Sequence, residues 1–310
     1  MNSVWSDATL ILLGHGTARR IGVPASMREQ ADIVRRRELF ARIEIAFWKK
    51  PPLLESVLAE VSTPQVCIVP MFLSGGHYAG EAIPRTLGLP PPLAGMRVRI
   101  GRWRTSLDRE GQGTGAGGAS SFAGTIVYCP AIGIHRRMAD VIRAAVQETV
   151  AEHPLPDGRK PADLAVILAA HGSRRHPGSR RAAEMQADRL RAAGCYADVI
   201  AVFLEESPGI EQWHLLTDRE HVVVIPFFMG AGRHSEEDIP MRLGIAPHIP
   251  EGQEGGQRIS RANPAGCGGR WIWLARPVGL QPGIAGVIAE IATEAADEAA
   301  RWNAGLEHGA

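Results

Sequence analysis

Residues 165–176 read Ala-Val-Ile-Leu-Ala-Ala-His-Gly-Ser-Arg-Arg-His, and this stretch decides the fold. Its first six residues are apolar, and five of them are small or β-branched, with no polar alternation, which is typical of a parallel strand covered on both faces. Gly172 permits a sharp exit from that strand. The pattern therefore predicts a strand that delivers the imidazole of His171 to its carboxyl edge, where ligand sites lie in open α/β sheets.

The same pattern occurs once before, because residues 8–17 read Ala-Thr-Leu-Ile-Leu-Leu-Gly-His-Gly-Thr. His15 and His171 lie 156 positions apart, and Phe47 and Phe203 repeat that offset. The sequence therefore predicts a tandem duplication with domains over residues 1–155 and 162–310. The stretch that joins them is rich in proline and charge, which is typical of a domain boundary.

Strands and helices are expected to alternate within each copy. Short apolar runs predict four strands per copy, at 9–13, 43–47, 66–73 and 125–129, and again at 164–170, 197–203, 222–228 and 271–275. Helical spacing follows most of them, for example over 53–61, 135–153, 181–193, 209–216 and 284–302. Glycine-rich loops are expected over 105–124 and 251–269. This order predicts an α/β protein of two tandem flavodoxin-like domains, each a four-stranded parallel sheet flanked by helices.

Composition narrows the class of protein. A chain of 310 residues with 45% hydrophobic content can bury two cores of ordinary size. The formal net charge of +1 argues against a nucleic-acid partner held by bulk electrostatics. The four cysteines lie far apart without a C-x-x-C, so neither a zinc knuckle nor a disulfide framework is expected. Without a basic leader or a run of about 20 apolar residues, we expect a soluble cytoplasmic protein with no membrane partner.

Histidines follow the first and the third expected strand of each copy. The third-strand histidines close Ser-Gly-Gly-His77 and Gly-Ala-Gly-Arg-His234. Neutral imidazoles that converge at strand edges suit a divalent transition metal. The alternative is that they are hydrogen-bonded loop residues, which a duplication would also copy. Acids four residues later, Glu81 and Asp238, either orient these imidazoles, ligate, or favour a helix dipole. The candidate metal ligands are His15, His77, His171 and His234.

Charges at the second strand differ between the copies. Glu205 and Glu206 end that strand in the second copy, whereas Lys49 and Lys50 stand there in the first. A carboxylate can accept a proton or hold a cation, whereas an ammonium group attracts carboxylates. Cationic residues at the same edge predict an acidic substrate, because an arginine can bind a carboxylate with two hydrogen bonds. The alternative is that these residues are solvent-exposed charges on loops with no substrate. The candidate substrate-binding residues are Arg19, Arg20, Lys49, Arg174 and Arg175.

Three motifs together carry a resemblance to a known family. They are His-Gly-Ser/Thr with a following Arg after strand one, Phe-Leu-Glu after strand two, and Gly-x-His followed by Asp-Ile-Pro after strand three. The combination resembles the class II chelatases of the sirohydrochlorin cobaltochelatase and ferrochelatase family (CbiX/SirB), over nearly the whole chain as two copies.

The resemblance implies a metal chelatase, a lyase of cobalamin or siroheme-type biosynthesis. Its substrates would be a divalent metal (Co²⁺, Fe²⁺ or Ni²⁺) and an acidic tetrapyrrole such as sirohydrochlorin, which meet without a nucleotide in a cleft between the domains. The family's histidine pair carries over onto His171 and His234, with His15 and His77 in the first copy. Its strand-two glutamate, which would accept protons, carries over to Glu205 only. The expected assembly is a monomer with pseudo-twofold symmetry.

Two other classes of protein share parts of this pattern. A histidine phosphatase also places His-Gly after its first strand, but it needs an arginine immediately before that histidine, where this chain has Gly14 and Ala170. A non-catalytic tetrapyrrole or metal carrier derived from a chelatase would keep the same ligands. Turnover with a tetrapyrrole and Co²⁺ separates that carrier from an enzyme.

Overall fold

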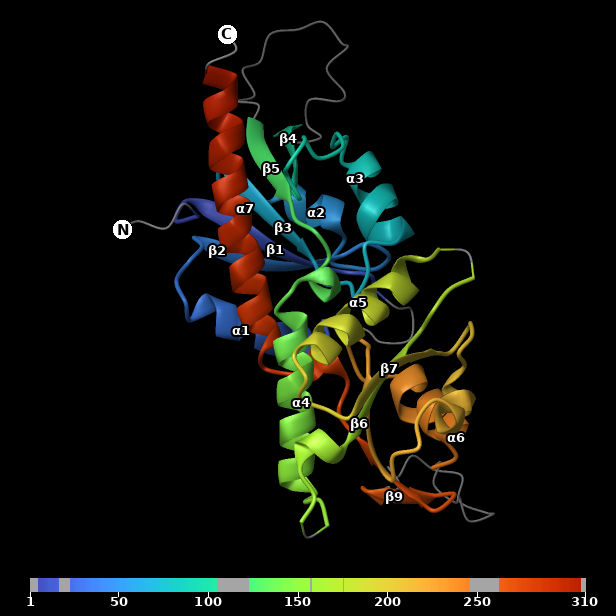
Figure 1. Ribbon diagram of the computed structural model, residues 1–310. Coiled ribbons are helices and arrows are strands. Elements are labelled where there is room, and N and C mark those ends of the chain that lie inside the picture. The colour runs from blue at the N-terminus through green and yellow to red at the C-terminus, as the bar shows by residue number, and fades with distance from the viewer. Residues whose placement is uncertain are drawn as a thin grey trace, which may run out of the picture. The chain divides into compact units, whose positions relative to one another are not determined.

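The computed structural model describes residues 5–16, 23–104, 123–156, 158–174, 176–245 and 262–307. It contains two five-stranded sheets of matching topology, β2-β1-β3-β5-β4 and β7-β6-β8-β10-β9 (Figure 1). Four strands of each sheet run parallel, and the fifth lies antiparallel at one edge. The predicted class, α/β with two tandem sheets, is confirmed, and each sheet has one strand more than the four predicted.

The first sheet is built from the first half of the chain. Its strands are β1 (Ala8–Gly14), β2 (Arg42–Phe47), β3 (Gln65–Pro70), β4 (Arg99–Arg104) and β5 (Ala123–Tyr128). The intervening helices are α1 (Ala25–Arg35), α2 (Leu54–Ala59), a π-helical turn His77–Ala82, α3 (Ile83–Thr86) and a 3₁₀ turn Ile132–Ile134. All seven residues of β1 are buried, which explains why its sequence shows no polar alternation.

The second sheet repeats this order. Its strands are β6 (Ala165–Ala170), β7 (Asp198–Phe203), β8 (His221–Pro226), β9 (Ala265–Cys267) and β10 (Arg270–Leu274). The helices of the second half are α5 (Gly178–Ala192), α6 (Ile239–Leu243) and α7 (Ile284–Glu307), with 3₁₀ turns Pro161–Asp163, Ile210–Leu215 and Val278–Leu280 and a π-helical turn His234–Asp238. The helix expected over 209–216 is thus a 3₁₀ helix, a geometry common in short connections. Helix α4 (Met138–Glu152) precedes this sheet in the chain.

The edge strands β4 and β9 were not expected from the sequence. β4 carries Arg at positions 99, 102 and 104 and a glycine at 101, so it shows no apolar run. β9 has only three residues and lies within the range expected as a loop, 251–269. Strands this short or this polar leave no periodic signal, because pairing with a neighbour stabilises them. Most of both glycine-rich stretches, namely residues 105–122 of the first and 251–261 of the second, lies outside the described residues.

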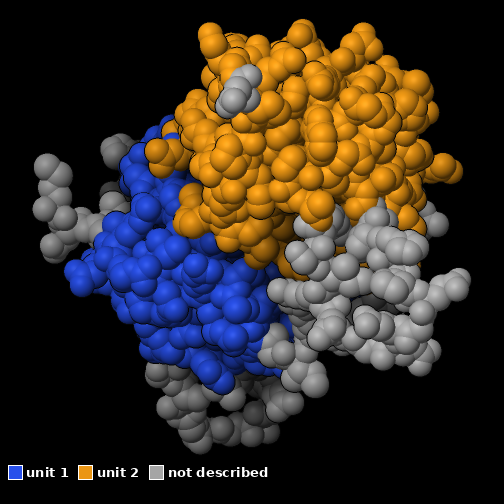
Figure 2. Space-filling view, turned by 90° about the horizontal axis from the view of Figure 1, so that it is seen from below, with its two compact units in different colours: residues 1–135, 285–310 blue, residues 136–284 orange. Residues whose placement is uncertain are grey.

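The chain forms two compact units, coloured separately in Figure 2: residues 1–135 with 285–310 (unit 1), and residues 136–284 (unit 2). They differ from the repeats 1–155 and 162–310 in their last helices. Helix α4 belongs to unit 2, where it packs against α5, β8 and β10. Helix α7 belongs to unit 1, where Trp5 Nε1 donates to the carbonyl of Ala292 at 2.7 Å. The two repeats have therefore exchanged their last helices.

Each unit buries its own hydrophobic core against one sheet. In unit 1, Ile11, Leu13 and Ile68 of the central strands pack with Leu54 and Leu58 of α2. In unit 2, the strand residues pack with Trp213 of the 3₁₀ turn and Ile239 of α6. These cores hold the strand ends, and the residues that follow them, in fixed positions. None of the helices in the described ranges is long and apolar enough to cross a membrane.

Candidate functional site

His171 is held at the end of β6 by the geometry of the next residue. Gly172 adopts φ +70°, and a Cβ there would lie 2.9 Å from Phe203 Cβ and 2.8 Å from Glu206 Cγ. Only glycine fits this turn without strain. The carbonyl of Gly172 lies 2.9 Å from His171 Nδ1. Because a carbonyl oxygen can only accept, Nδ1 carries the proton and Nε2 keeps the lone pair that could bind a metal.

His234 begins the π-helical turn that follows β8. The hydroxyl of the buried Ser235 fixes this turn, because it accepts from Gly232 N at 3.0 Å and donates to Gly232 O at 3.1 Å. His234 Nδ1 lies 2.7 Å from Asp238 Oδ2, four residues later. A carboxylate that accepts from one ring nitrogen orients the imidazole and raises the basicity of the other nitrogen. Asp238 therefore orients the ring of His234 and leaves its Nε2 available.

The three residues predicted as catalytic come together in unit 2. The rings of His171 and His234 have centroids 5.0 Å apart and lie nearly perpendicular, at 86°. Glu205 Oε1 lies 3.7 Å from His171 Nε2. All three side chains are solvent-accessible, with 41%, 49% and 56% exposure for His171, His234 and Glu205. His171 thus contacts both His234 and Glu205, and these exposed imidazoles and the carboxylate are ligand types that Co²⁺ or Fe²⁺ accepts.

The neighbouring Glu206 has a different role from Glu205. Its two carboxylate oxygens accept from Ser173 N at 2.9 Å and from Arg180 Nε at 3.0 Å. Arg180 also pairs with Glu184 at 2.8 Å. Burial alone would lower the pKa of Arg180, but the hydrogen bonds to Glu184 and Glu206 raise it above its ordinary value. Glu206 and Arg180 therefore hold the loop after β6, a distinction that the sequence alone did not make.

A cavity of about 820 Å³ opens beside Glu205. Arg174 is exposed at its wall, where its Nε donates to the carbonyl of Glu205 at 3.2 Å. The volume falls in the range of small-molecule sites, and the guanidinium offers further donors for a carboxylate. Arg19, Arg20 and Arg175 lie outside the described residues. The lining residues include Ser173, Arg174, Glu205, Ser207, Gln212 and Arg242.

The equivalent edge of unit 1 has a different composition. His15 Nδ1 faces the carbonyl of Gly16 at 3.0 Å, and His77 Nδ1 faces Glu81 Oε2 at 3.3 Å. The ring of Tyr78, however, contacts both imidazoles, with centroid distances of 4.8 Å to His15 and 5.4 Å to His77. The ammonium of Lys49 lies 5.7 Å from the Tyr78 ring centroid. This edge therefore presents an aromatic ring and a cation at the positions where unit 2 presents Ser235 and Glu205.

Sequence reasoning missed Tyr78, although its signal was present. The residue after the third-strand histidine is Tyr78 in one copy and Ser235 in the other. The turn that carries Tyr78 is fixed from β5 and β4, because Tyr128 Oη donates to Ala79 O and Arg99 Nη2 to Gly80 O, both at 2.9 Å. Burial raises the pKa of Tyr128 above its ordinary range, so its hydroxyl stays a donor.

Fold and site together define a class: a tandem α/β protein with a histidine after the first and third parallel strands of each sheet. The CbiX family model matches this chain twice, over residues 9–149 and 165–295. The chain therefore belongs to the CbiX family, and the resemblance noted in its motifs is confirmed. The two matched ranges correspond to the two sequence repeats.

Three known proteins are similar over most of the chain. A probable sirohydrochlorin cobaltochelatase of Halobacterium salinarum is 29% identical over 286 residues, which cover 92% of this chain and 91% of that protein. SirB from Bacillus subtilis, solved with Fe³⁺, superposes with a TM-score of 0.58 at 16% identity and covers 94% of this chain and 96% of SirB. DR2241 from Deinococcus radiodurans, a multi-domain protein described as structurally similar to chelatases, superposes with a TM-score of 0.64 at 24% identity over 92% of this chain and 54% of DR2241.

Proposed function

We propose that this protein is a metal chelatase that inserts Co²⁺ or Fe²⁺ into sirohydrochlorin or a tetrapyrrole of the same acidic class. The observation that carries the proposal is the contact of His171 with both His234 and Glu205 at one strand edge of unit 2. Membership of the CbiX family and the full-length similarity to a probable sirohydrochlorin cobaltochelatase support it. The metal is a substrate here, and Ni²⁺ is a third candidate because the same ligand types accept it.

The ligand set explains how the reaction would proceed. Insertion requires the hydrated cation to lose water while the macrocycle loses two pyrrole N–H protons. The Nε2 atoms of His171 and His234 replace water on the cation, and the proton on each Nδ1 stays engaged with Gly172 O or Asp238. The carboxylate of Glu205 lies beside His171 Nε2 and accepts one of the two protons, and the imidazole nitrogen of His171 accepts the other as the metal leaves it. No nucleotide enters this scheme.

The substrate carboxylates would be bound by the cations at the same strand edges. Arg174 stands at the wall of the cavity beside Glu205, and its guanidinium matches a carboxylate in geometry. In unit 1, Lys49 and the exposed ring of Tyr78 offer an ammonium and an aromatic face, which suit a carboxylate and a flat macrocycle. We assign substrate binding to these residues and, from their place in the sequence, to Arg19, Arg20 and Arg175.

An insertion assay tests the proposal. The purified chain is mixed anaerobically with sirohydrochlorin and Co²⁺, Fe²⁺ or Ni²⁺ without nucleotide, and the macrocycle absorbance is followed against a protein-free control. We expect catalytic turnover with Co²⁺ or Fe²⁺ well above the spontaneous rate. Tight binding of the tetrapyrrole with no acceleration for any of the three metals would contradict the proposal and favour the carrier.

A further inference from the structure

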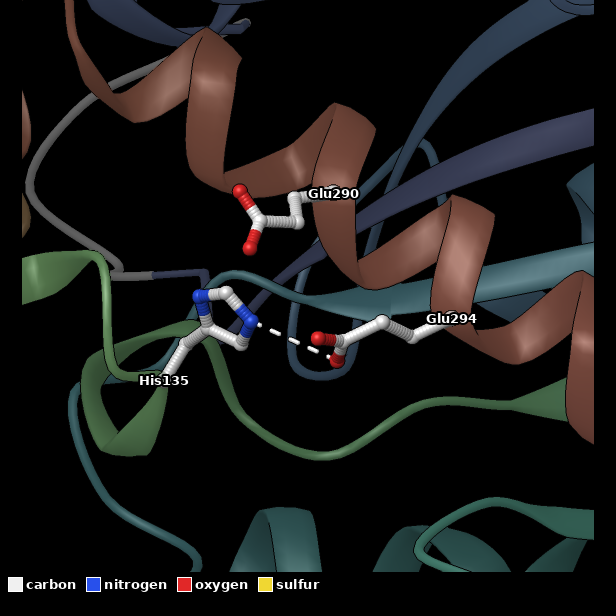
Figure 3. A group of neighbouring side chains, drawn as sticks. All are labelled: His135, Glu290 and Glu294. Atoms are coloured by element: carbon white, nitrogen blue, oxygen red, sulfur yellow. Dashed lines mark ion pairs between the residues drawn. The ribbon is translucent and has the colours of Figure 1, made fainter.

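Unit 1 contains a second group of metal-type ligands, separate from the residues at the strand edges. His135, Glu290 and Glu294 each offer one ligand atom, and the three atoms lie within 4.8 Å of one another. Figure 3 shows both carboxylates directed at the imidazole from successive turns of α7. The proposed chelatase reaction uses none of these residues.

Two rigid elements position this group. His135 follows the 3₁₀ turn Ile132–Ile134 and donates its backbone N–H to Ile132 O at 3.1 Å. Its side chain is only 3% exposed. Glu290 and Glu294 are four residues apart on α7 and therefore share a helix face. A buried imidazole and two carboxylates one turn apart thus point at one small volume.

The next glutamate on the same helix face shows what a purely structural carboxylate does here. Glu298 is buried, and its Oε2 accepts from Arg97 N at 2.7 Å and from Val98 N at 3.0 Å. These bonds fix the rotation of α7 about its axis. Glu294 is thereby held with its Oε2 3.4 Å from His135 Nε2, where it also accepts from Arg97 Nη2 at 2.7 Å.

We propose that His135, Glu290 and Glu294 bind a divalent transition metal that fastens α7 to the body of unit 1. Metal bonds to imidazole nitrogen and carboxylate oxygen are about 2.0–2.2 Å, so two ligands at a tetrahedral angle lie roughly 3.3–3.6 Å apart. The 3.4 Å between Nε2 and Oε2 already fits, and the other ligand atoms, which all lie within 4.8 Å of one another, reach this separation with a side-chain movement of about 1 Å. One nitrogen and two oxygen ligands suit Zn²⁺, Co²⁺, Fe²⁺ or Mn²⁺.

A measurement of Co²⁺ binding distinguishes the proposed site at His135 from the histidines at the strand edges. The H15A/H77A/H171A/H234A variant removes the four edge histidines, and equilibrium dialysis with Co²⁺ alone then measures the metal that remains bound. We expect the four-histidine variant to bind about one equivalent of Co²⁺ and to show a higher Tm with Co²⁺ than without it. Adding E290Q and E294Q should lower the Co²⁺ affinity tenfold or more and abolish the rise in Tm. The matched control is D297N in the four-histidine variant, which changes an exposed carboxylate on the same helix and should leave both the Co²⁺ affinity and the Co²⁺-dependent rise in Tm unchanged.

Two outcomes overturn the proposal. If the four-histidine variant binds no Co²⁺ while circular dichroism shows that it is folded, the group is an ion-pair cluster between an imidazolium and two carboxylates. If E290Q/E294Q leaves Co²⁺ affinity unchanged, the bound metal lies elsewhere. Neither result bears on insertion at His171 and His234, so failure here is distinguishable from failure of the proposed chelatase activity.

Discussion

At the scale of single residues, the side chain after each third-strand histidine governs how the two histidines of that sheet meet. Ser235 is buried and bonded to Gly232, so the rings of His171 and His234 contact each other directly. Tyr78 projects its ring against both His15 and His77. One substitution between the copies therefore turns a pair of convergent imidazoles into an aromatic cluster.

The contact between His234 and Asp238 leads to a prediction for metal use. Asp238→Asn keeps an acceptor for His234 Nδ1 but removes the negative charge that would favour a metal cation at Nε2. We expect the KM for Co²⁺ to rise by about tenfold, with the KM for the tetrapyrrole unchanged. Steady-state insertion rates over a range of Co²⁺ concentrations measure this. Glu81→Gln makes the equivalent change at His77 and serves as the control, and equal losses in both variants would contradict the assignment.

Arg174 leads to a prediction for substrate binding. Its side chain is exposed at the cavity wall, and we expect it to bind a peripheral carboxylate equally in the ground state and the transition state. Arg174→Ala should therefore raise the KM for the tetrapyrrole by about 5- to 10-fold and change kcat little. Arg174→Lys keeps the positive charge and should recover part of the affinity. A fall in kcat with unchanged KM would show that Arg174 acts on the chemistry instead.

At the scale of elements, the turn after the fourth parallel strand supports the loop that leads to the third-strand histidine. Gly279 N donates to Phe228 O at 2.9 Å, and a Cβ on Gly279 would lie 2.4 Å from Met229 O. Gly133 makes the same contact in unit 1, where a Cβ would lie 2.1 Å from Leu73 O. Close backbone approach therefore requires glycine at both positions.

Gly279→Ala should break this support in unit 2. The methyl group would meet the backbone of Met229, which cannot move without shifting the loop before His234. We expect a loss of about 1–3 kcal/mol in the free energy of unfolding and a fall in the insertion rate, measured by thermal denaturation and by the insertion assay. Gly230→Ala adds the same methyl group where no atom lies within 4 Å, so it should change Tm little. A Gly279→Ala protein as stable as Gly230→Ala would contradict this account.

The sequence predicted the elements whose signal is local. The buried runs of β1 and β6 show a strand pattern by themselves, and their repetition located the four histidines. The edge strand β4 and the contact of Tyr78 with His15 depend on neighbours far away in the chain, so no local pattern marks them. The edge strand β9 pairs with β10 across Gly268 and Gly269, but its three residues are too few to show a strand pattern. The helix exchange is invisible for another reason: α4 and α7 each need an apolar face, but that face does not specify which sheet it covers.

At the scale of the whole molecule, duplication has produced two units with one topology and different chemistry. Glu205 lies beside His171 in unit 2, whereas Lys49 stands at the equivalent place in unit 1. A divalent cation is less stable near an ammonium group than near a carboxylate, by about 1–2 kcal/mol at an effective dielectric constant of roughly 20 after screening. That difference favours metal at unit 2 by roughly tenfold. We therefore propose that unit 2 carries the metal and proton chemistry, and that Lys49 of unit 1 contributes to substrate binding in addition to Arg174 of unit 2.

Insertion rates of four single variants at one fixed Co²⁺ concentration test this assignment most directly. His171→Ala and His234→Ala should each reduce the rate to the spontaneous level, because each removes one of the two imidazoles that meet beside Glu205. His15→Ala and His77→Ala should keep a measurable fraction of the wild-type rate, with the loss appearing as a higher KM for the tetrapyrrole. Inactive His15→Ala and His77→Ala proteins beside active His171→Ala and His234→Ala proteins would reverse the assignment and place the metal in unit 1.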